Sequence, residues 1–231
     1  GTFRRNLPTV SAAKPGGKSP KATAKRYQKA LYDTDTTLVI ATGPAGTGKT
    51  MLACTQGMNG LTDGQYERMI LTRPLVPVGG EDIGFLPGDM HDKMTPWVSH
   101  MVDYVDRFDL KFVRSKIDVV PFSYMRGETW ENKWIIADEM QNSTPIQMKT
   151  LLTRIGNNSK LVITGDLSQS DLPADRVNGL RDLLDRIESD SGEFYKHVEF
   201  TEDDIQRSAF VKSILRLYSP AVEPRRDSGL A

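Results

Sequence analysis

The chain has 231 residues, of which 30 are lysine or arginine and 30 are aspartate or glutamate, so its formal net charge is zero. Hydrophobic residues make up 38% and charged residues 26%, which is close to globular averages and excludes an intrinsically disordered chain. No apolar run is long enough to span a bilayer, and the single cysteine, Cys54, cannot form an intramolecular disulfide. We therefore expect a cytoplasmic protein without membrane contact, with Cys54 buried in a helix.

The N-terminal segment is basic and rich in proline and glycine. Eight lysines and arginines precede the first acidic residue, Asp33. Residues 1–20 are therefore expected to form a flexible basic arm that can dock on phosphates, and a solvated tail is the alternative. We expect residues 21–218 to form a single folded domain and residues 219–231 to form a flexible tail.

Short apolar runs alternate with helical patterns along the expected domain. Buried strands are predicted at 38–41, 69–71, 119–122, 134–137, 161–164 and 197–200. Helices are predicted at about 50–60, 94–107, 145–154, 176–189 and 204–217. Pro145 suits a first helical turn, with Ser143 or Thr144 as the cap. Strands that alternate with helices are typical of a mainly parallel sheet flanked by helices, so the predicted fold class is α/β.

A glycine-rich turn connects the first strand to the first predicted helix. Its sequence is Gly43-Pro44-Ala45-Gly46-Thr47-Gly48-Lys49-Thr50. Glycines let backbone N–H groups turn inward around phosphates, and the following helix directs its positive end at them. These eight residues are expected to bind ATP, with Lys49 reaching the β and γ phosphates during catalysis and the Thr50 hydroxyl ligating Mg²⁺. A glycine-rich turn without a ligand is the alternative.

Two carboxylates, Asp138 and Glu139, follow the predicted strand 134–137. Ligands bind at the carboxyl ends of strands in parallel sheets, so both side chains are expected at the nucleotide. Asp138 is predicted to share the Mg²⁺ ion with Thr50, and Glu139 is predicted to orient and deprotonate the attacking water. A base for water favours hydrolysis, so residues 21–218 are expected to form a P-loop ATPase domain. Ordinary acids at a strand end are the alternative.

A second polar cluster, Gly165-Asp166-Leu167-Ser168-Gln169, follows the predicted strand 161–164. Either Gln169 or Asp166 is expected to sense the γ-phosphate, and we predict that Gln169 takes part in catalysis. Alone, this cluster would indicate only a turn. Its place after the glycine-rich turn and the paired carboxylates favours a functional role.

Together these motifs resemble the PhoH family, P-loop ATPases similar in their core to superfamily 1 helicases, and its phage-encoded members especially. Four blocks carry the resemblance: Gly43 to Thr50; Leu71-Thr72-Arg73-Pro74 with Gly84-Phe85-Leu86-Pro87-Gly88-Asp89; Tyr124-Met125-Arg126-Gly127; and Ala137-Asp138-Glu139-Met140-Gln141-Asn142 with Gly165 to Gln169. The resemblance implies a RecA-like core and ATP hydrolysis coupled to RNA or single-stranded DNA. It also implies a homo-oligomer, expected as a hexameric ring with ATP at the subunit interface. A phage-encoded chain would work in the host cytoplasm.

Three arginines are candidates for contacts with phosphates. The segment Asp204-Ile205-Gln206-Arg207 resembles the family's C-terminal arginine motif, which would make Arg207 an arginine finger, and a surface charge is the alternative. Arg73 and Arg126 lie near predicted strand ends, where they are expected to contact ATP or a nucleic-acid backbone. Ion pairs within loops are the alternative for both.

The chain departs from the family pattern upstream of the glycine-rich turn. Relatives often place a glutamine that reads adenine one turn before an aromatic residue, whereas here Ala24 precedes Tyr27 and Gln28 follows it. The acidic cluster of the nuclease domain that some relatives carry has no counterpart, so we predict no nuclease activity.

The three histidines, His91, His100 and His197, lack the spacing of metal ligands. We expect each of them on the surface or in a packing role.

Two functions from different classes compete. The leading one is an oligomeric ATPase that acts on nucleic acid, with strand separation by a helicase mechanism requiring neighbouring subunits to supply the second lobe. The alternative is a nucleotide-dependent assembly switch or scaffold for a protein partner, without helicase activity. A small-molecule kinase is disfavoured because Glu139 is placed to activate water.

Overall fold

The computed structural model describes residues 22–74, 99–106, 114–122, 125, 127, 129–173, 175–190 and 192–205. In chain order its elements are α1 (Ala22–Tyr32), β1 (Leu38–Thr42), α2 (Lys49–Thr62), β2 (Arg68–Thr72), β3 (Ile117–Val119), β4 (Lys133–Ala137), η3 (Met140–Asn142), α5 (Pro145–Leu152), β5 (Lys160–Gly165), α6 (Gly179–Glu188), β6 (Tyr195–Glu199) and η4 (Glu202–Asp204). Residues 99–106 are also helical. The expected arm (1–20) and tail (219–231) lie outside the described residues.

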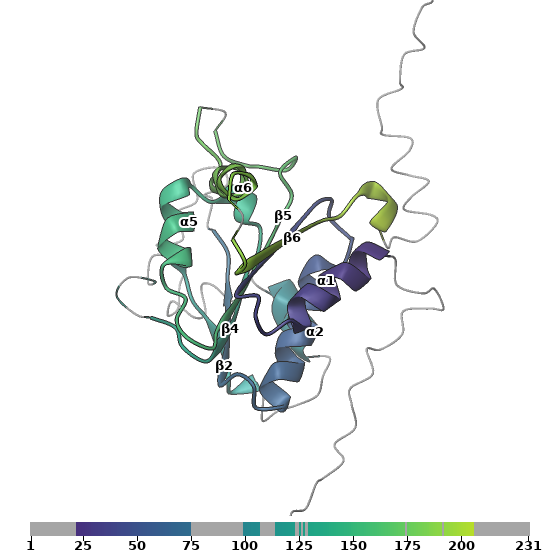
Figure 1. The fold of residues 1–231 in the computed structure, drawn as a ribbon, viewed down its shortest axis with the longest axis vertical. Coiled ribbons are helices and arrows are strands. Elements are labelled where there is room, and N and C mark those ends of the chain that lie inside the picture. The colour runs from purple at the N-terminus through teal and green to yellow at the C-terminus, as the bar shows by residue number, and fades with distance from the viewer. Residues whose placement is uncertain are drawn as a thin grey trace, which may run out of the picture.

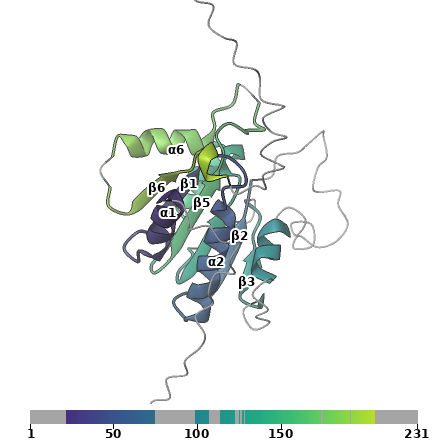
Figure 2. The same cartoon turned by 90° about the vertical axis from the view of Figure 1, so that its right-hand side faces the viewer.

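The six strands form one sheet in the order β3-β2-β4-β5-β1-β6. All five strand pairs of this described sheet are parallel. Figure 2, which looks onto α1 and α2, shows β3 and β6 at its opposite edges. Because parallel strands end at the same edge, the turns that follow β1, β4 and β5 lie together. β5 separates β1 from β4, so the segment after β5 lies between the other two turns.

Helices cover both faces of the sheet, and alternate strand residues pack against each layer. Figure 1 shows α1 and α2 on one face and α5 and α6 on the other. Strand residues packed in the cluster with α1, α2 and helix 99–106 are Val39, Ala41, Met69, Leu71, Trp134, Ile136, Val162 and Val198. Those in the cluster with α5 and α6 are Ile40, Ile70, Ile135, Ala137, Leu161 and Ile163. Strands buried on both faces need such continuous apolar runs. The parallel sheet with helices on both faces confirms the predicted α/β class.

Most predicted elements are present with small shifts at their ends. Thr144 is the cap before Pro145, and its hydroxyl forms a reciprocal capping box with Gln147. Cys54 is fully buried in α2, as expected. The strand predicted at 119–122 is wrong in position, because β3 ends at Val119, two residues before Pro121, which has no N–H to donate to a neighbouring strand. The helix predicted at 204–217 lies outside the described residues except for its first two positions.

Helix α1 was not predicted, although its sequence carries an amphipathic signal. Ala24, Tyr27, Ala30 and Leu31 recur at helical spacing and are all buried. Their exposed neighbours are mostly lysine and arginine. The apolar stripe packs on α2 and the sheet.

A buried lysine fastens the end of α1 to the sheet. Lys160, the first residue of β5, is 2% exposed. Its ammonium donates to the carbonyl oxygens of Ala30 at 3.3 Å, Leu31 at 2.9 Å and Asp33 at 2.5 Å, and lies 6.0 Å from the Trp134 ring centroid. The last carbonyls of a helix have no partner within the helix, so Lys160 satisfies groups that would otherwise be buried without one.

The membrane prediction can be checked only for the described part of the chain. None of the helices there has both the length and the apolar content needed to cross a bilayer.

Candidate nucleotide-binding site

The turn between β1 and α2 has a backbone that requires glycine. Gly43, Gly46 and Gly48 have φ angles of 123°, 79° and 90°, which L side chains rarely adopt. At Gly43 a Cβ atom would also lie 2.1 Å from the carbonyl oxygen of Phe200. The sequence Gly43 to Thr50 therefore forms a compact loop that leads directly into the first turn of α2, whose N–H groups suit an anion.

Lys49 is the first residue of α2 and is 8% exposed. Its ammonium donates to the carbonyl oxygens of Gly43 at 2.6 Å and Pro44 at 2.8 Å, and to the Thr47 hydroxyl at 3.2 Å. Burial lowers the pKa of Lys49, while nearby carboxylates, Asp138 foremost, act in the opposite direction. The charge is thus held on the glycine-rich loop, beside the carboxylates that follow β4 and β5.

Thr50 and Asp138, the predicted Mg²⁺ ligands, are in contact. The Thr50 hydroxyl donates to Asp138 Oδ1 at 3.0 Å, and the Thr164 hydroxyl donates to the same oxygen. His100 Nε2 lies 2.6 Å from Asp138 Oδ2. Burial alone would raise the pKa of Asp138, but the hydrogen bond and charge of His100 and the two hydroxyls outweigh it and lower the pKa overall.

This pair suits Mg²⁺ bound together with phosphate. Mg²⁺ in nucleotide sites takes one or two protein oxygens and completes its shell with phosphate oxygens and water. Thr50 and Asp138 offer that hard oxygen pair, and the lowered pKa keeps Asp138 ionised. The described residues contain no group of three or more His, Cys, Asp or Glu side chains that could hold a metal alone.

Glu139 has an unusual backbone conformation. Its φ of 55° and ψ of 37° are left-handed, which costs free energy for a residue with a side chain. Glu139 lies two residues after the end of β4 and is the N-cap residue of the short helix η3. Gln141 Nε2 donates to Glu139 Oε2 at 2.5 Å, so the carboxylate is held from one side.

The turn after β5 supplies the opposite wall. Asp166 Oδ1 accepts hydrogen bonds from the backbone N–H of Ser168 at 3.0 Å and from its hydroxyl at 2.7 Å. The second oxygen, Oδ2, is buried and has no hydrogen-bond partner among the described residues. Gln169 is exposed at the same rim. A buried acceptor without a partner beside a cationic loop is typical of a site that completes itself with a ligand or ordered water.

These groups surround one hollow of about 190 Å³ that opens to solvent. Its lining residues are Ala45, Gly46, Gly48, Lys49, Thr50, Met51, His100, Tyr104, Asp138, Glu139, Gly165, Asp166 and Gln169. The carboxyl edge of the sheet thus brings together the glycine-rich loop and both strand ends that the sequence singled out.

The PhoH-like protein family model matches residues 18–219 of the chain. The chain belongs to the PhoH family. It is 38% identical over 200 residues to the PhoH-like protein of Bacillus subtilis, an alignment covering 84% of this chain and 61% of the relative. It is 40% identical over 201 residues to Protein PhoH of Escherichia coli K12, covering 84% and 55%. The chain thus spans about three fifths of the length of these PhoH relatives.

Two solved structures are similar at the level of overall shape. The Pif1 helicase from Candida albicans aligns with 14% identity and a TM-score of 0.42, over 87% of this chain and 44% of the helicase. The N-terminal domain of the DNA packaging ATPase from bacteriophage phi29 aligns with 13% identity and a TM-score of 0.46, over 82% and 99%. The RecA-like P-loop fold expected for a PhoH-family chain agrees with the parallel sheet and with the place of its glycine-rich loop.

The predicted site residues of this PhoH-family chain divide into three groups. Those in Gly43 to Thr50, with Asp138, Glu139 and Gln169, lie in or beside the hollow. Arg73 follows β2 at the same edge of the sheet, is partly buried and does not line the described hollow. Arg126 and Arg207 lie outside the described residues.

The structure adds two residues to the site of this PhoH protein. His100 was expected on the surface or in a packing role; its side chain is 41% exposed, and its ring also contacts Asp138 in the hollow. Gln141, quoted only as part of a motif, contacts Glu139. No local signal pointed to His100, which is 38 residues from Asp138 in sequence. The position of Gln141 two residues after a predicted base was a signal available in the sequence.

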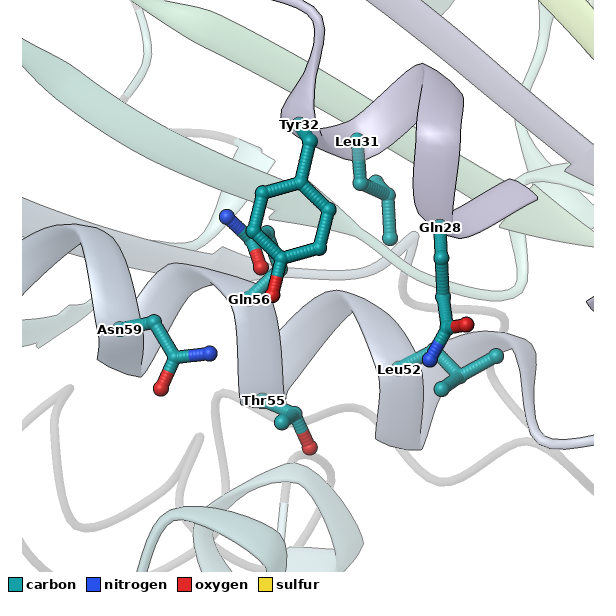
Figure 3. A pocket seen from close by; sticks show the side chains of 7 residues that line it. All are labelled: Gln28, Leu31, Tyr32, Leu52, Thr55, Gln56 and Asn59. Carbon is teal, nitrogen blue, oxygen red and sulfur yellow. The ribbon is translucent and has the colours of Figure 1, made fainter. Parts of the chain in front are cut away.

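A second, smaller hollow lies between α1 and α2. It is lined by Gln28, Leu31, Tyr32, Leu52, Thr55, Gln56 and Asn59. Figure 3 shows Gln28 and Tyr32 pointing from α1 toward α2. Gln28 is not among the residues that line the nucleotide hollow, Ala24 and Tyr27 are buried, and the Tyr27 ring packs edge-on against Phe200 with ring centroids 5.5 Å apart.

Proposed function

We propose that this chain is a Mg²⁺-dependent ATPase whose hydrolytic cycle is coupled to RNA or single-stranded DNA. The observation that carries the ATPase proposal is the convergence of Lys49, the Thr50–Asp138 pair and Glu139 on one hollow. Each of these groups has a distinct task in phosphoryl transfer to water, and all three come from the carboxyl edge of one sheet.

The roles of the residues follow from their chemistry. Lys49 would exchange its loop carbonyl partners for β- and γ-phosphate oxygens, and Thr50 and Asp138 would hold Mg²⁺. Bound Mg²⁺ neutralises phosphate charge. Glu139 accepts a proton from water as the water oxygen attacks the γ-phosphorus and the bond to the β–γ bridging oxygen breaks, which leaves ADP and phosphate. Gln169, at the rim, contacts the γ-phosphate.

The proposal also includes coupling to nucleic acid and assembly into an oligomer. The described residues form one lobe whose nucleotide hollow opens to solvent, which supports a neighbouring subunit as the part that covers the γ-phosphate. We propose a homo-oligomer, a hexameric ring by family resemblance, with Arg207 reaching the neighbour's nucleotide. Arg73, at the same sheet edge, and Arg126 would contact a strand backbone.

The decisive experiment measures ATP turnover with and without single-stranded RNA and single-stranded DNA. We expect Mg²⁺-dependent turnover that either nucleic acid stimulates. Glu139→Gln should keep nucleotide affinity and reduce kcat by about 10²- to 10⁴-fold, because only the base is lost. Turnover that persists in Glu139→Gln would contradict the assigned base. A rate of ATP turnover that neither RNA nor single-stranded DNA changes would favour the nucleotide-dependent assembly switch.

The subunit interface has its own test. Arg207→Ala should reduce kcat by about 10³- to 10⁵-fold if the arginine acts across an interface. Mixing Arg207→Ala with Glu139→Gln should then restore some turnover, since mixed interfaces pair an intact base with an intact arginine. No recovery despite demonstrated subunit exchange would place Arg207 outside the neighbour's site.

A further inference from the structure

The side-chain amide of Gln141 joins the two strand ends of the nucleotide site. The residue lies in η3 and is 1% exposed. Its Nε2 donates to Glu139 Oε2 at 2.5 Å and faces the carbonyl oxygen of Gln169 at 3.5 Å. Its Oε1 accepts from the backbone N–H of Asp166 at 3.0 Å. One buried amide thus touches the predicted base and the segment that carries the predicted γ-phosphate sensor.

The orientation of this amide is determined by its neighbours. A backbone N–H can only donate, so the N–H of Asp166 requires the Gln141 oxygen on its side, and the Gln141 nitrogen must face Glu139. Gly165 leaves the necessary space, because a Cβ atom there would lie 2.9 Å from Gln141 Oε1. The main-chain carbonyl oxygen of Gln141 accepts from the Ser170 hydroxyl at 3.0 Å and from Asn178 Nδ2 at 2.7 Å, which fixes the backbone that carries the amide. The amide is therefore held in one direction.

The hydrogen bond leaves Glu139 suited to act on water. Gln141 holds one carboxylate oxygen, and within the described residues the other, Oε1, accepts no hydrogen bond. A general base needs one free oxygen aimed at the water and a second that is fixed, because small displacements at the reacting atoms cost much rate. The left-handed backbone of Glu139 already directs the side chain, and Gln141 fixes its far end.

The next residue provides an internal comparison. Asn142 Nδ2 donates to Asp171 Oδ2 at 3.2 Å, and Asn142 Oδ1 accepts from the Asp171 N–H at 2.8 Å. Asn142 therefore ties η3 to the segment after β5 much as Gln141 does. Its backbone N–H donates to the Glu139 carbonyl oxygen at 3.0 Å, but among the described contacts its side chain makes no hydrogen bond with the Glu139 carboxylate. The contact with the carboxylate is thus the feature that distinguishes Gln141 from a purely structural tie.

We propose that Gln141 is a positioning residue that holds Glu139 for water activation and makes its placement depend on the segment Asp166 to Gln169. This inference rests on the proposed ATPase function. When Gln169 meets the γ-phosphate, a displacement of its segment reaches Glu139 through a single side chain. Loss of the amide should therefore slow turnover without weakening nucleotide binding.

The test compares Gln141→Met, which keeps side-chain length and removes the amide, with Asn142→Leu as the matched control. We expect Gln141→Met to lower kcat by about 10- to 100-fold, while the Kd for a fluorescent ADP changes less than about twofold. Asn142→Leu should keep kcat within about threefold of the unchanged protein, even if it lowers the melting temperature as much as Gln141→Met does. Equal losses of kcat in the two variants would overturn the proposal.

Coupling to the sensor is measured with Gln169→Ala. If Gln141 and Gln169 act through one connection, the double variant should have nearly the kcat of the slower single variant rather than the product of both losses. Independent, multiplying losses would overturn the coupling.

A second substitution, Gln141→Glu, tests the same role if Gln141→Met does not fold. Gln141→Glu keeps size and an acceptor for the Asp166 N–H but turns a carboxylate oxygen toward Glu139, so kcat should fall at unchanged Kd. Unchanged kcat in Gln141→Glu would overturn the proposal. Turnover that depends on Glu139 but not on Gln141 would refute this inference alone, whereas absence of ATP turnover in the unchanged protein would refute the proposed function as well.

Discussion

Two buried lysines, Lys49 and Lys160, mark opposite ends of the strands. Both ammonium groups donate to backbone carbonyl oxygens, Lys49 to those of the glycine-rich loop and Lys160 to those at the end of α1. Burial lowers the pKa of both. Their local chemistry is thus nearly the same, although one lies at the carboxyl edge of the sheet and the other at the amino edge.

The difference lies in what else surrounds each charge. Lys49 borders an open hollow with Asp138, Asp166 and Glu139 nearby, so a phosphate can replace its carbonyl partners. Lys160 is enclosed by α1 and lies near the Trp134 ring. A buried lysine is therefore a ligand-binding group or a structural one according to whether its partners can be exchanged. The first should affect nucleotide affinity and the second stability.

The largest effect is expected at Lys49. Lys49→Met keeps the side-chain stem and removes the phosphate cation, so nucleotide Kd should rise roughly 10- to 100-fold, since a hydrogen bond to a charged group contributes about 1.5–3 kcal/mol. Calorimetric titration with ADP and Mg²⁺ measures this, and thermal unfolding should change little. A variant that loses stability while keeping nucleotide affinity would reverse the roles of the two lysines.

Lys160→Met should do the opposite. It leaves buried carbonyl oxygens at the end of α1 without a donor, so the free energy of unfolding should fall by about 1–3 kcal/mol, with nucleotide Kd unchanged. Urea unfolding measures the loss. Lys196→Met is the control, because that half-exposed lysine pairs with the Asp33 carboxylate nearby and should change stability less. Equal losses in both variants would argue that burial of Lys160 contributes nothing.

The pH dependence of stability sharpens the assignment of Lys160. Burial lowers the pKa of Lys160 from 10.5 to about 8, so between these values the unfolded chain binds more protons than the folded one. Stability should rise with pH across this window, by roughly 1 kcal/mol per pH unit relative to Lys160→Met. Urea unfolding at about pH 8.5 and about pH 9.5 checks this. If the difference in unfolding free energy between the unchanged protein and Lys160→Met does not change with pH, the three carbonyl oxygens stabilise the charged ammonium as well as water does.

The smallest effect is expected at the cap of α5. Thr144→Ala removes the capping box with Gln147 and should lower the free energy of unfolding by about 1 kcal/mol. The cap follows η3 near the carboxyl edge but does not line the hollow, so nucleotide affinity should stay the same. Weaker nucleotide binding in this variant would show that stability and binding are not separable at this edge.

The nucleotide loop and the paired carboxylates were predictable because their information is local. Four apolar residues, a glycine-rich turn and a helical start lie together between Leu38 and Thr50, and Asp138 and Glu139 directly follow an apolar run. Backbone sterics and the shared edge of parallel strands then place these groups near one another. Most element positions followed from the same short-range periodicity.

Other features depended on segments far apart in the chain. The contact of His100 with Asp138 spans 38 residues, and Lys160 reaches Leu31 across 129. Neither spacing has a periodic signature, because strand order and register decide it. The position of β5 between β1 and β4 brings Thr164 to Asp138 and Asp166 to Gln141.

By itself, the sequence determined the glycine-rich loop and the residue types at the strand ends, from which it predicted a phosphate loop, a hydroxyl and a carboxylate for Mg²⁺, and a base for water. Only the tertiary structure decided which additional side chains surround these groups. The physical reason is that a short motif specifies its own backbone, whereas the partners of a buried charge or amide depend on which distant segments the packed sheet and helices bring within hydrogen-bonding distance.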